Sequence, residues 1–201
     1  MEKGLAIITG ADGGMGQVIT AALAKEGYPV IMACLDPEKA ASLCNRIQQE
    51  TGNTQIEVRR IDLASLSSVN NFTGQLLKEG RPVSRLMNNA GILTTPVRKT
   101  EDGLETIVSV NYVAPYMLTR QLLPLMQPGC RIVNTVSCTY AIGRIEPDFF
   151  EKGRNGRFFR IPVYSNTKLA LLLFTQEFAE RLQDKDITIN ASDPGIVSTN
   201  M

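Results

Sequence analysis

The stretch LAIITGADGGMG, residues 5–16, decides the fold of this chain. It joins a short apolar run, which suits a buried strand, to a loop rich in glycine. Glycines let a chain turn tightly and let backbone N–H groups approach a ligand closely. Residues 14–25 have helical spacing, so a helix N-terminus behind the loop would offer unpaired donors and partial positive charge to a pyrophosphate. The alternative is a glycine-rich turn that holds no ligand.

The rest of the chain repeats this alternation of strand and helix. Further strands are expected at residues 29–35, 56–61, 85–88, 131–137 and 187–192, and further helices at 37–50, 65–78, 105–126 and 164–182. Pro115 should bend the helix that contains it. Strands that are apolar on both faces and alternate with helices indicate an α/β fold. We expect a Rossmann-type, doubly wound parallel sheet with helices on both faces.

The composition fits one compact domain. The chain has 201 residues, of which 43% are hydrophobic. Its 21 basic and 20 acidic residues nearly cancel, which argues against a protein that coats nucleic acid or an acidic membrane. The longest unbroken apolar run, residues 169–174, is too short to span a bilayer. No signal segment is visible and the four cysteines form no CxxC pair, so we expect buried free thiols, no metal site and a cytoplasmic location.

Tyr164 and Lys168 stand four residues apart at the head of an apolar run in a chain without histidine. Residues four apart share one face of a helix, so the lysine can place its charge near the phenol. At ~4 Å and an effective dielectric of ~20, a unit charge favours the phenolate by up to ~4 kcal/mol. That is about three pKa units before desolvation subtracts from it. We therefore predict that Tyr164 is a general acid/base whose pKa is lowered by Lys168; the alternative is an exposed pair on an ordinary helix.

Three motifs in this order resemble the short-chain dehydrogenase/reductase family: TGADGGMG at 9–16, NNAG at 88–91 and YSNTK at 164–168. Asp62-Leu63, Asn111, Ser137 and Pro194-Gly195 also fall where that family has its landmarks. The resemblance runs from about residue 5 to the end. RIDLASLSSV, TEDGLETIVSVNYVAPYMLT and RIVNTVS look especially like the retinol-dehydrogenase-like branch. One motif would be weak, but an ordered set along the whole chain is specific.

The resemblance implies an oxidoreductase that interconverts an alcohol and a ketone or aldehyde by hydride transfer. It assigns Ser137 to a hydrogen bond with the substrate oxygen and Tyr164 to proton transfer. Asn111 would support a water that relays protons to Lys168, which would also grip the nicotinamide ribose. Without the resemblance, Ser137 is a strand-end hydroxyl and Asn111 a polar residue tolerated in a helix.

The resemblance also implies a nicotinamide dinucleotide, NAD or NADP, with Asp62 at the adenine and Thr199 at the carboxamide. Besides Tyr164 and Lys168, it assigns to the cofactor Gly10, Asp12, Gly14, Met15, Gly16, Leu35, Asp62, Leu63, Asn89, Ala90, Gly91, Pro194, Gly195, Ile196 and Thr199. For the asparagines and glycines of this set, ordinary turn chemistry is the alternative.

The choice between NAD and NADP stays open. A carboxylate at the end of the second strand would accept the ribose hydroxyls of NAD, whereas an arginine would pair with the 2′-phosphate of NADP. Cys34 and Leu35, which occupy this place, are neither. Asp36 comes one residue later and suits the N-cap of the next helix equally well. Lys39 could reach a phosphate, while Asp12 stands where NADP-preferring relatives often have a basic residue.

The segment between Ser137 and Tyr164 is longer than the resemblance implies, and residues 138–163 are expected to form an insertion loop. One hypothesis is that Arg144 or Arg160 steers an anionic group there, beneath an apolar lip made by Phe149, Phe150, Phe158 and Phe159. The alternative is a solvated loop that tucks its aromatic side chains onto the domain.

We expect a single NAD(P)-binding domain over residues 1–201 that lacks the C-terminal substrate segment of its relatives. Its partner would be a small carbonyl or alcohol compound, apolar in character, with no nucleic acid and no membrane span; the resemblance implies a homodimer or homotetramer. The alternative is a non-catalytic dinucleotide-binding regulatory module. The early end favours the module, whereas the set Asn111, Ser137, Tyr164 and Lys168 favours the enzyme.

Overall fold

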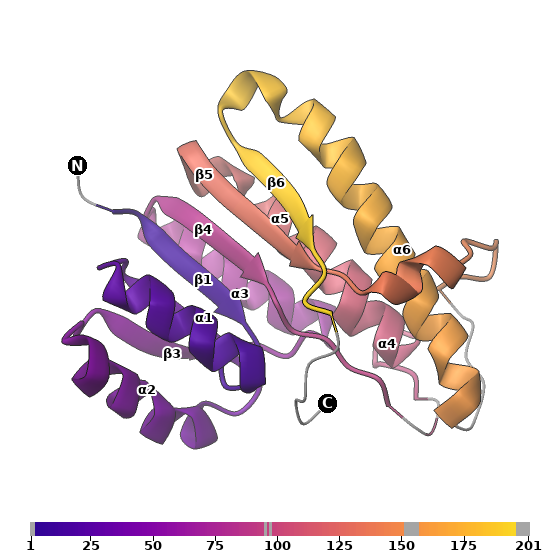
Figure 1. Ribbon diagram of the computed structural model, residues 1–201, viewed down its shortest axis with the longest axis horizontal. Coiled ribbons are helices and arrows are strands. Elements are labelled where there is room, and N and C mark those ends of the chain that lie inside the picture. The colour runs from indigo at the N-terminus through magenta and orange to yellow at the C-terminus, as the bar shows by residue number, and fades with distance from the viewer. Residues whose placement is uncertain (1–2, 95, 97, 151–156, 196–201) are drawn as a thin grey trace.

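Six parallel strands form one sheet in the order β3-β2-β1-β4-β5-β6 (Figure 1). The computed structural model describes residues 3–94, 96, 98–150 and 157–195. The strands are β1 (Leu5–Thr9), β2 (Val30–Cys34), β3 (Ile56–Arg60), β4 (Val83–Asn88), β5 (Met126–Thr135) and β6 (Thr188–Ser192). The chain winds outward from β1 to β3 and then crosses to β4 on the other side of β1. The predicted Rossmann-type, doubly wound sheet is therefore confirmed.

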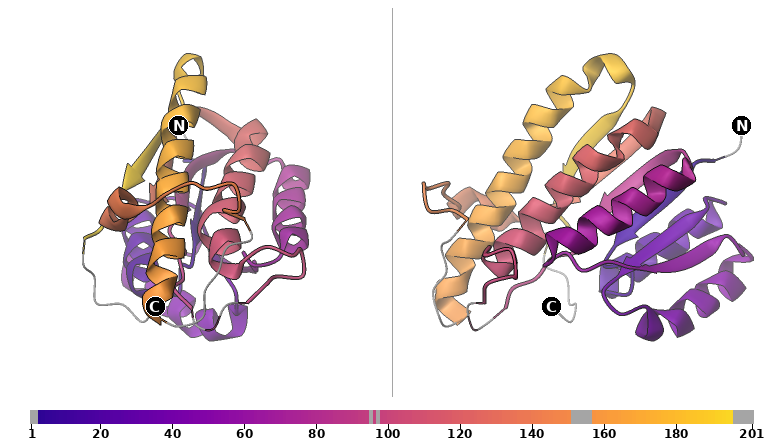
Figure 2. Two further views of the ribbon diagram at one scale, coloured as in Figure 1. Left: turned by 90° about the vertical axis from the view of Figure 1, so that its right-hand side faces the viewer. Right: turned by 180° about the vertical axis from the view of Figure 1, so that it is seen from behind.

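Helices cover both faces of the sheet (Figure 2). On one face lie α1 (Gly14–Lys25) and α2 (Pro37–Thr51). On the other, three helices lie side by side: α3 (Leu66–Glu79), α5 (Ala114–Leu122) and α6 (Arg157–Arg181). The short helix α4 (Thr106–Val108) precedes α5. Among the described residues, no helix combines the length and the apolar character that a bilayer crossing needs.

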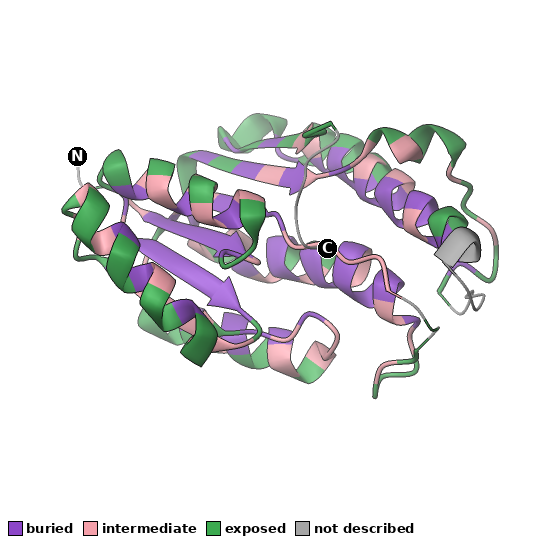
Figure 3. Ribbon diagram, turned by 60° about the horizontal axis from the view of Figure 1, so that its bottom comes forward, coloured by how far each residue is buried: buried purple, intermediate pink, exposed green. Residues whose placement is uncertain are grey.

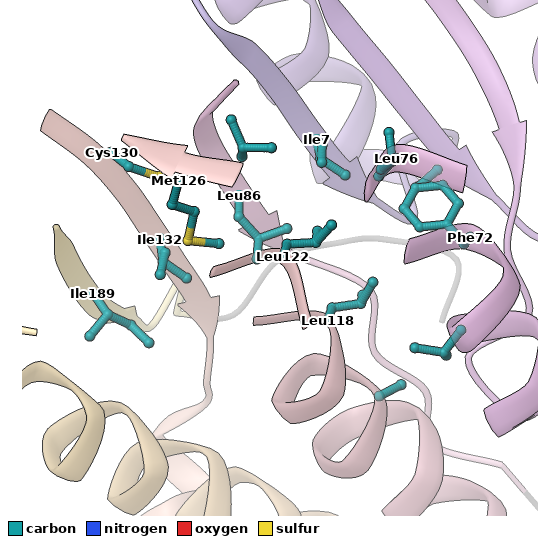
Figure 4. Packing of buried hydrophobic residues seen from close by; sticks show 14 of the residues in the cluster. Ile7, Phe72, Leu76, Leu86, Leu118, Leu122, Met126, Cys130, Ile132 and Ile189 are labelled. Carbon is teal, nitrogen blue, oxygen red and sulfur yellow. The ribbon is translucent and has the colours of Figure 1, made fainter. Parts of the chain in front are cut away.

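Neighbouring residues of β1 belong to two different hydrophobic cores. Ile7 packs with side chains of α3, α5 and α6, whereas Ile8 packs with those of α1 and α2. Successive side chains of a strand point to opposite faces, so one strand serves both cores. Figure 4 shows the larger core, where Phe72 and Leu118 meet the strands, and Figure 3 shows buried strands between helices whose outer faces are exposed.

The edge strand β6 departs from the expectation that every strand is apolar on both faces. Ile189 is buried, whereas Thr188 and Asn190 on either side of it are exposed. This strand alternates because α6 covers one of its faces and its other face meets solvent.

Local capping explains where α2 and α3 begin. Asp36 caps α2 by accepting the backbone N–H of Lys39 at 3.3 Å, and Pro37 occupies the first turn. Its carboxylate also forms an ion pair with the Lys39 ammonium at 3.0 Å. Ser65 caps α3 through the N–H of Ser68. Of the two roles open to Asp36, the structure therefore shows the helix cap.

The helix expected at residues 105–126 is divided. A π-helical turn, Ser109–Val113, separates α4 from α5, and β5 already begins at Met126. Pro115 has no N–H, so the carbonyl of Asn111 loses the partner that an α-helix would give it. The N–H of Ala114 instead reaches back to the carbonyl of Ser109, the wider spacing of a π turn. The predicted bend at Pro115 thus takes the form of a π turn immediately before it.

The segment expected to be an irregular loop over 138–163 contains regular structure at both ends. Cys138–Ile142 forms a 3-10 helix, and α6 begins at Arg157, well before the predicted start at Tyr164. Pro162 lies in the second turn of α6, where its missing N–H removes one hydrogen bond of the helix without ending it.

Candidate active site

Three of the predicted motif segments meet at the carboxyl edge of the sheet. Asn88 of β4 lies opposite Asn134 of β5, and Thr135 of β5 lies opposite Ser192 of β6. The glycine loop leaves the same edge at the end of β1 (Figure 1). In open parallel sheets, ligands bind at this edge, near the point where the strand order reverses.

The hydroxyl of Thr9 fastens the NNAG segment to the glycine loop. Its Oγ1 accepts the backbone N–H groups of Asn89 at 3.0 Å and of Ala90 at 3.1 Å. In return, the Asn89 amide donates to the carbonyl of Thr9 at 2.9 Å. The two loops are therefore one hydrogen-bonded unit. The Oδ1 of Asn89 is buried and has no partner in the described part of the chain.

Only glycine fits at two places after β1, one in the loop and one in the first turn of α1. Gly10 has a φ of 60°, and an added Cβ would lie 3.1 Å from the Cα of Ala90. A Cβ at Gly16 would lie 2.1 Å from the carbonyl oxygen of Gly10. Because these two residues have no side chain, the loop backbone can lie close to the first turn of α1, which contains Gly14 and Met15.

The residues present fit a dinucleotide phosphate at this loop. No side chain caps the N-terminus of α1, so its first N–H groups stay available to an anion. The orphaned Oδ1 of Asn89, whose amide nitrogen contacts the Gly10 carbonyl, is an acceptor for a hydroxyl of the same ligand. Asp12 lies near Cys34, where burial and the Asp12 carboxylate together raise the pKa of the Cys34 thiol to about 12.

Ser137, Tyr164 and Lys168 come together where the chain that follows β5 meets the N-terminal half of α6. The Lys168 Nζ lies 5.4 Å from the centroid of the Tyr164 ring and donates to the carbonyl of Thr135 at 2.7 Å. The side chains of Ser137 and Tyr164 are hydrogen-bonded. Lys168 is buried, with 2% of its surface exposed. The Ser137 hydroxyl, the Tyr164 phenol and the Lys168 ammonium are thus close neighbours.

The predicted direction of the Tyr164 pKa is wrong. Burial raises the pKa of Tyr164; the hydrogen bond with Ser137 opposes this effect, and the carboxylate of Asp193 adds to it. Burial also lowers the pKa of Lys168 to about 8, which weakens the charge that was expected to act on the phenol. The phenol is therefore held protonated, the form that can donate a proton to a carbonyl oxygen.

Asn111 uses its side chain to hold the segment after NNAG. Its Oδ1 accepts the N–H of Ile92 at 2.8 Å, and its Nδ2 donates to the Ile92 carbonyl at 3.0 Å. Gly91 fits between this amide and the lysine, since an added Cβ would lie 3.4 Å from the Nζ of Lys168 and 3.7 Å from the Oδ1 of Asn111. Asn111 lies in the expected place, but its side chain is hydrogen-bonded to the backbone of Ile92.

The other predicted cofactor residues have structural partners of their own. Asp62 accepts the N–H of Ala64 at 2.9 Å in the turn before α3. Leu63 is buried, and its carbonyl accepts the Ser109 hydroxyl at 3.0 Å. Leu35 is 60% exposed directly after β2.

Pro194 and Gly195 follow β6 at the carboxyl edge, whereas Ile196 and Thr199 lie outside the described residues. Sequence reasoning gave no role to Asp193, but its Oδ1 accepts the Gly195 N–H at 2.9 Å. The sequence Asp-Pro-Gly is a signal for such a turn.

Among the described residues of the insertion, Phe149 supports the alternative that aromatic side chains pack onto the domain. Phe149 is 5% exposed and meets the Tyr112 ring edge-on at 5.7 Å, so it packs onto the domain. Phe150 is 47% exposed. Both line a hollow of about 420 Å³ with residues of the C-terminal half of α6, and Phe149 also belongs to the cluster against which the Tyr164 ring packs. The side chains of Phe158 and Phe159 lie outside the described residues.

The two arginines of the insertion behave differently. Arg144 is exposed, and its backbone N–H donates to the Asn166 Oδ1 at 2.7 Å. Arg160 is completely buried in an ion pair with Glu105, and its Nε donates to the Thr94 carbonyl at 2.8 Å. The hypothesis that Arg160 steers an anionic group is therefore wrong, because its charge is already paired with Glu105. Glu105 gave no signal in the sequence, because an isolated acid does not reveal a buried partner.

The family model of short chain dehydrogenases matches residues 4–147 and 151–201. Retinol dehydrogenase 13 of Homo sapiens is 36% identical over 197 residues, and retinol dehydrogenase 12 of Mus musculus is 37% identical over 193. These alignments cover 97% and 95% of this chain but only 59% and 60% of the relatives, so the chain spans about three-fifths of their length.

Solved structures resemble this chain over nearly its whole length. An uncharacterized protein from Mycobacterium Paratuberculosis has a TM-score of 0.85 and 34% identity, with coverage of 100% of this chain and 71% of that one. A short-chain dehydrogenase from Sphingobium yanoikuyae in complex with NADPH has a TM-score of 0.77 and 22% identity, with coverage of 98% and 72%.

Proposed function

Because this chain belongs to the short-chain dehydrogenase family, we propose that it is an NAD(P)-dependent oxidoreductase that interconverts an alcohol and a ketone or aldehyde. The observation that carries the proposal is the meeting of Ser137, Tyr164 and Lys168 beside the glycine loop. The proton donor Tyr164 and the glycine loop that would bind a phosphate lie at the same edge of the sheet. This pairing is what a hydride transfer coupled to a proton transfer requires.

When bound, a nicotinamide dinucleotide would supply or accept the hydride. The side chains of the protein would position the substrate and transfer the proton. The Ser137 hydroxyl and the Tyr164 phenol would hold the substrate oxygen between them, and the phenol would donate its proton as negative charge develops there. In the oxidation of an alcohol, the same phenol oxygen would take the proton back. Lys168, buried against the Tyr164 ring, would stabilise the phenolate that donation leaves behind.

The glycine loop, the N-terminus of α1 and Asn89 would hold the dinucleotide. Either NAD or NADP suits the residues after β2. Asp36 is engaged in capping α2, and Lys39 pairs with Asp36, so neither is free to select a ribose hydroxyl or a phosphate. The NADPH of the Sphingobium yanoikuyae enzyme belongs to a protein with 22% identity and leaves this choice open.

The substrate would be apolar next to its reacting group. The Tyr164 ring packs in a cluster that includes Ile92, Leu93 and the buried Val163. The curated relatives are retinol dehydrogenases, and their names point to an alcohol with a hydrocarbon body. We therefore propose apolar ketones, aldehydes and alcohols as the substrate class.

The test is a turnover assay with NADH and NADPH against a panel of apolar carbonyl compounds, following nicotinamide absorbance. Tyr164→Phe should lower kcat by at least ~100-fold, because it removes the proton donor, while dinucleotide affinity stays within a few-fold. Tyr116→Phe is the matched control, since the Tyr116 ring of α5 lies against Phe174 in the C-terminal half of α6. Dinucleotide binding without any turnover by the unmutated chain would overturn the proposal and support a regulatory module.

A further inference from the structure

Arg160 and Thr94 each leave one buried polar atom without a partner in the described part of the chain: the Nη1 of the arginine and the Oγ1 of the threonine. The other guanidinium nitrogens are engaged, Nη2 with the Glu105 carboxylate and Nε with the Thr94 carbonyl at 2.8 Å. Buried polar groups in folded proteins nearly always have a partner. The two residues are in contact through the Nε–carbonyl bond, so a polar group bound beside this contact would give the orphan atoms a partner.

The orphans lie one helical turn from the phenol. Arg160, Tyr164 and Lys168 follow one another at intervals of four residues along α6, so they share one face of the helix. Four residues of α-helix rise ~6 Å. Arg160, which carries the free guanidinium N–H, therefore lies one turn before Tyr164 in α6, whereas Lys168 lies one turn after it.

The segment from Gly91 to Thr94 runs along the same face of α6. Its first residue lies beside Lys168, as the 3.4 Å approach of Nζ to an added Cβ at Gly91 shows, and its last residue is bonded to Arg160. Leu93, between them, packs in the cluster that contains the Tyr164 ring. A molecule whose reacting carbon lies at the phenol would thus have Arg160 and Thr94 at the end away from Lys168.

The charge balance decides which group the orphans accept. Arg160 and Glu105 are both completely buried, and they neutralise each other. A carboxylate bound at Nη1 would leave one buried negative charge without compensation, which is strongly unfavourable. A neutral oxygen adds no charge, accepts the Nη1–H and can also accept the Thr94 hydroxyl proton.

We propose that Arg160 and Thr94 bind a second, neutral oxygen of the substrate, so that the preferred substrates are apolar carbonyl compounds with a second carbonyl or ether oxygen a few bonds from the reacting one. This inference rests on the proposed function and refines its substrate class. It makes Arg160 and Thr94 specificity-determining residues, whereas Ser137 and Tyr164 carry the chemistry.

The test compares a linear methyl ketone with the diketones of equal length whose second carbonyl lies two, three or four carbons away. The kcat/KM of one diketone should exceed that of the monoketone by about tenfold. In Thr94→Val this preference should fall to about twofold or less. The matched control, Thr106→Val, removes a hydroxyl that donates to the Arg98 carbonyl at 2.8 Å, and the preference should survive there. Thr94→Val is chosen over an Arg160 variant because loss of the guanidinium would strand the buried Glu105 carboxylate.

A binding measurement separates this inference from the proposed chemistry. Calorimetric titration of Tyr164→Phe, saturated with NADH or NADPH, should give the same tenfold preference for the diketone, because binding does not require proton transfer. Equal affinities for monoketone and diketones would overturn the inference even if the monoketone is turned over. A keto acid of the same length that outranks every diketone would overturn it as well, since the argument excludes an anion.

Discussion

Lys168 holds an ammonium in a place almost closed to water. The neighbour that accepts its hydrogen bond is the neutral carbonyl of Thr135. Burial without an opposing charge favours the neutral amine and lowers the pKa of Lys168 to about 8. Below this pH the folded chain therefore bears a desolvation penalty that the unfolded chain does not.

The penalty predicts a pH-dependent difference in stability between the natural chain and Lys168→Met. Between a pKa of about 8 in the folded chain and 10.5 in the unfolded one, the unfolded chain binds more protons, so the free energy of unfolding rises with pH. From about pH 7 to about pH 9.5, the natural chain should gain about 2 kcal/mol relative to Lys168→Met. Urea unfolding of both proteins measures this, because other titrating groups cancel in the difference. A constant difference would show that Lys168 titrates alike in both states.

The meeting of Ser137, Tyr164 and Lys168 was predictable from the sequence, but their electrostatics were not. The spacing of Tyr164 and Lys168 places them one helical turn apart, whereas Ser137 was singled out by the family resemblance. The pKa of Tyr164 depends on burial and on Asp193, which is distant in the chain and reaches the phenol only through the fold. The pairing of Glu105 with Arg160 is hidden for the same reason.

At the scale of elements, the loop between β1 and α1 is packed too closely for any side chain at Gly16. We predict that Gly16→Ala weakens dinucleotide binding more than tenfold and costs about 1–3 kcal/mol of stability, because its Cβ would lie 2.1 Å from the Gly10 carbonyl oxygen. Equilibrium titration with NADH and NADPH and urea unfolding measure the two effects. Retained affinity would mean that the loop can shift without loss of its ligand geometry.

The same substitution in α3 should have the opposite effect. An added Cβ at Gly74 has no heavy atom within 4 Å, and the residue lies inside a regular helix. Gly74→Ala should therefore raise the free energy of unfolding by about 0.5–1 kcal/mol, because alanine loses less backbone entropy. Dinucleotide affinity should stay unchanged, which makes this variant the control for Gly16→Ala.

Element boundaries were the weakest part of the prediction. Periodicity alone joined α4, the π turn and α5 into one helix over 105–126, because apolar residues continue across the interruption. The cause of that interruption is one missing N–H at Pro115, which pattern reasoning interpreted as a bend. In α6 the helix starts at Arg157, before Pro162, whereas the predicted helix began at Tyr164.

At the scale of the whole molecule, the buried Glu105–Arg160 pair ties together parts that are far apart in the chain. Glu105 caps α4 through the N–H of Val108 at 3.1 Å, and Arg160 stands at the start of α6 and holds Thr94. Replacing one partner would leave an uncompensated buried charge, whereas replacing both would not.

This predicts a non-additive double-mutant cycle. Glu105→Gln and Arg160→Met should each lower the free energy of unfolding by about 3–5 kcal/mol. The double variant should lose less than the sum of the two losses, by more than 1 kcal/mol. Urea unfolding of the four proteins gives all the terms. Additive losses would mean that the two charges do not depend on each other.

A doubly wound parallel sheet was predicted from the alternation of strands and helices, whereas the exposure of its edge strand was not. β6 reads as a mixed run, and only its position beside α6 explains why Ile189 is buried between two exposed neighbours. Whether a strand has one covered face or two depends on what packs against it, which a single sequence does not state.

Because Tyr164 and Lys168 lie in one continuous helix, the spacing between the phenol and the ammonium follows from the helical pitch and does not depend on any loop. Movement of the surrounding loops would therefore leave the distance between these two residues unchanged. Under the proposed function, a change of substrate class would act through the side chains of residues 91–94 and would leave Tyr164 and Lys168 in place.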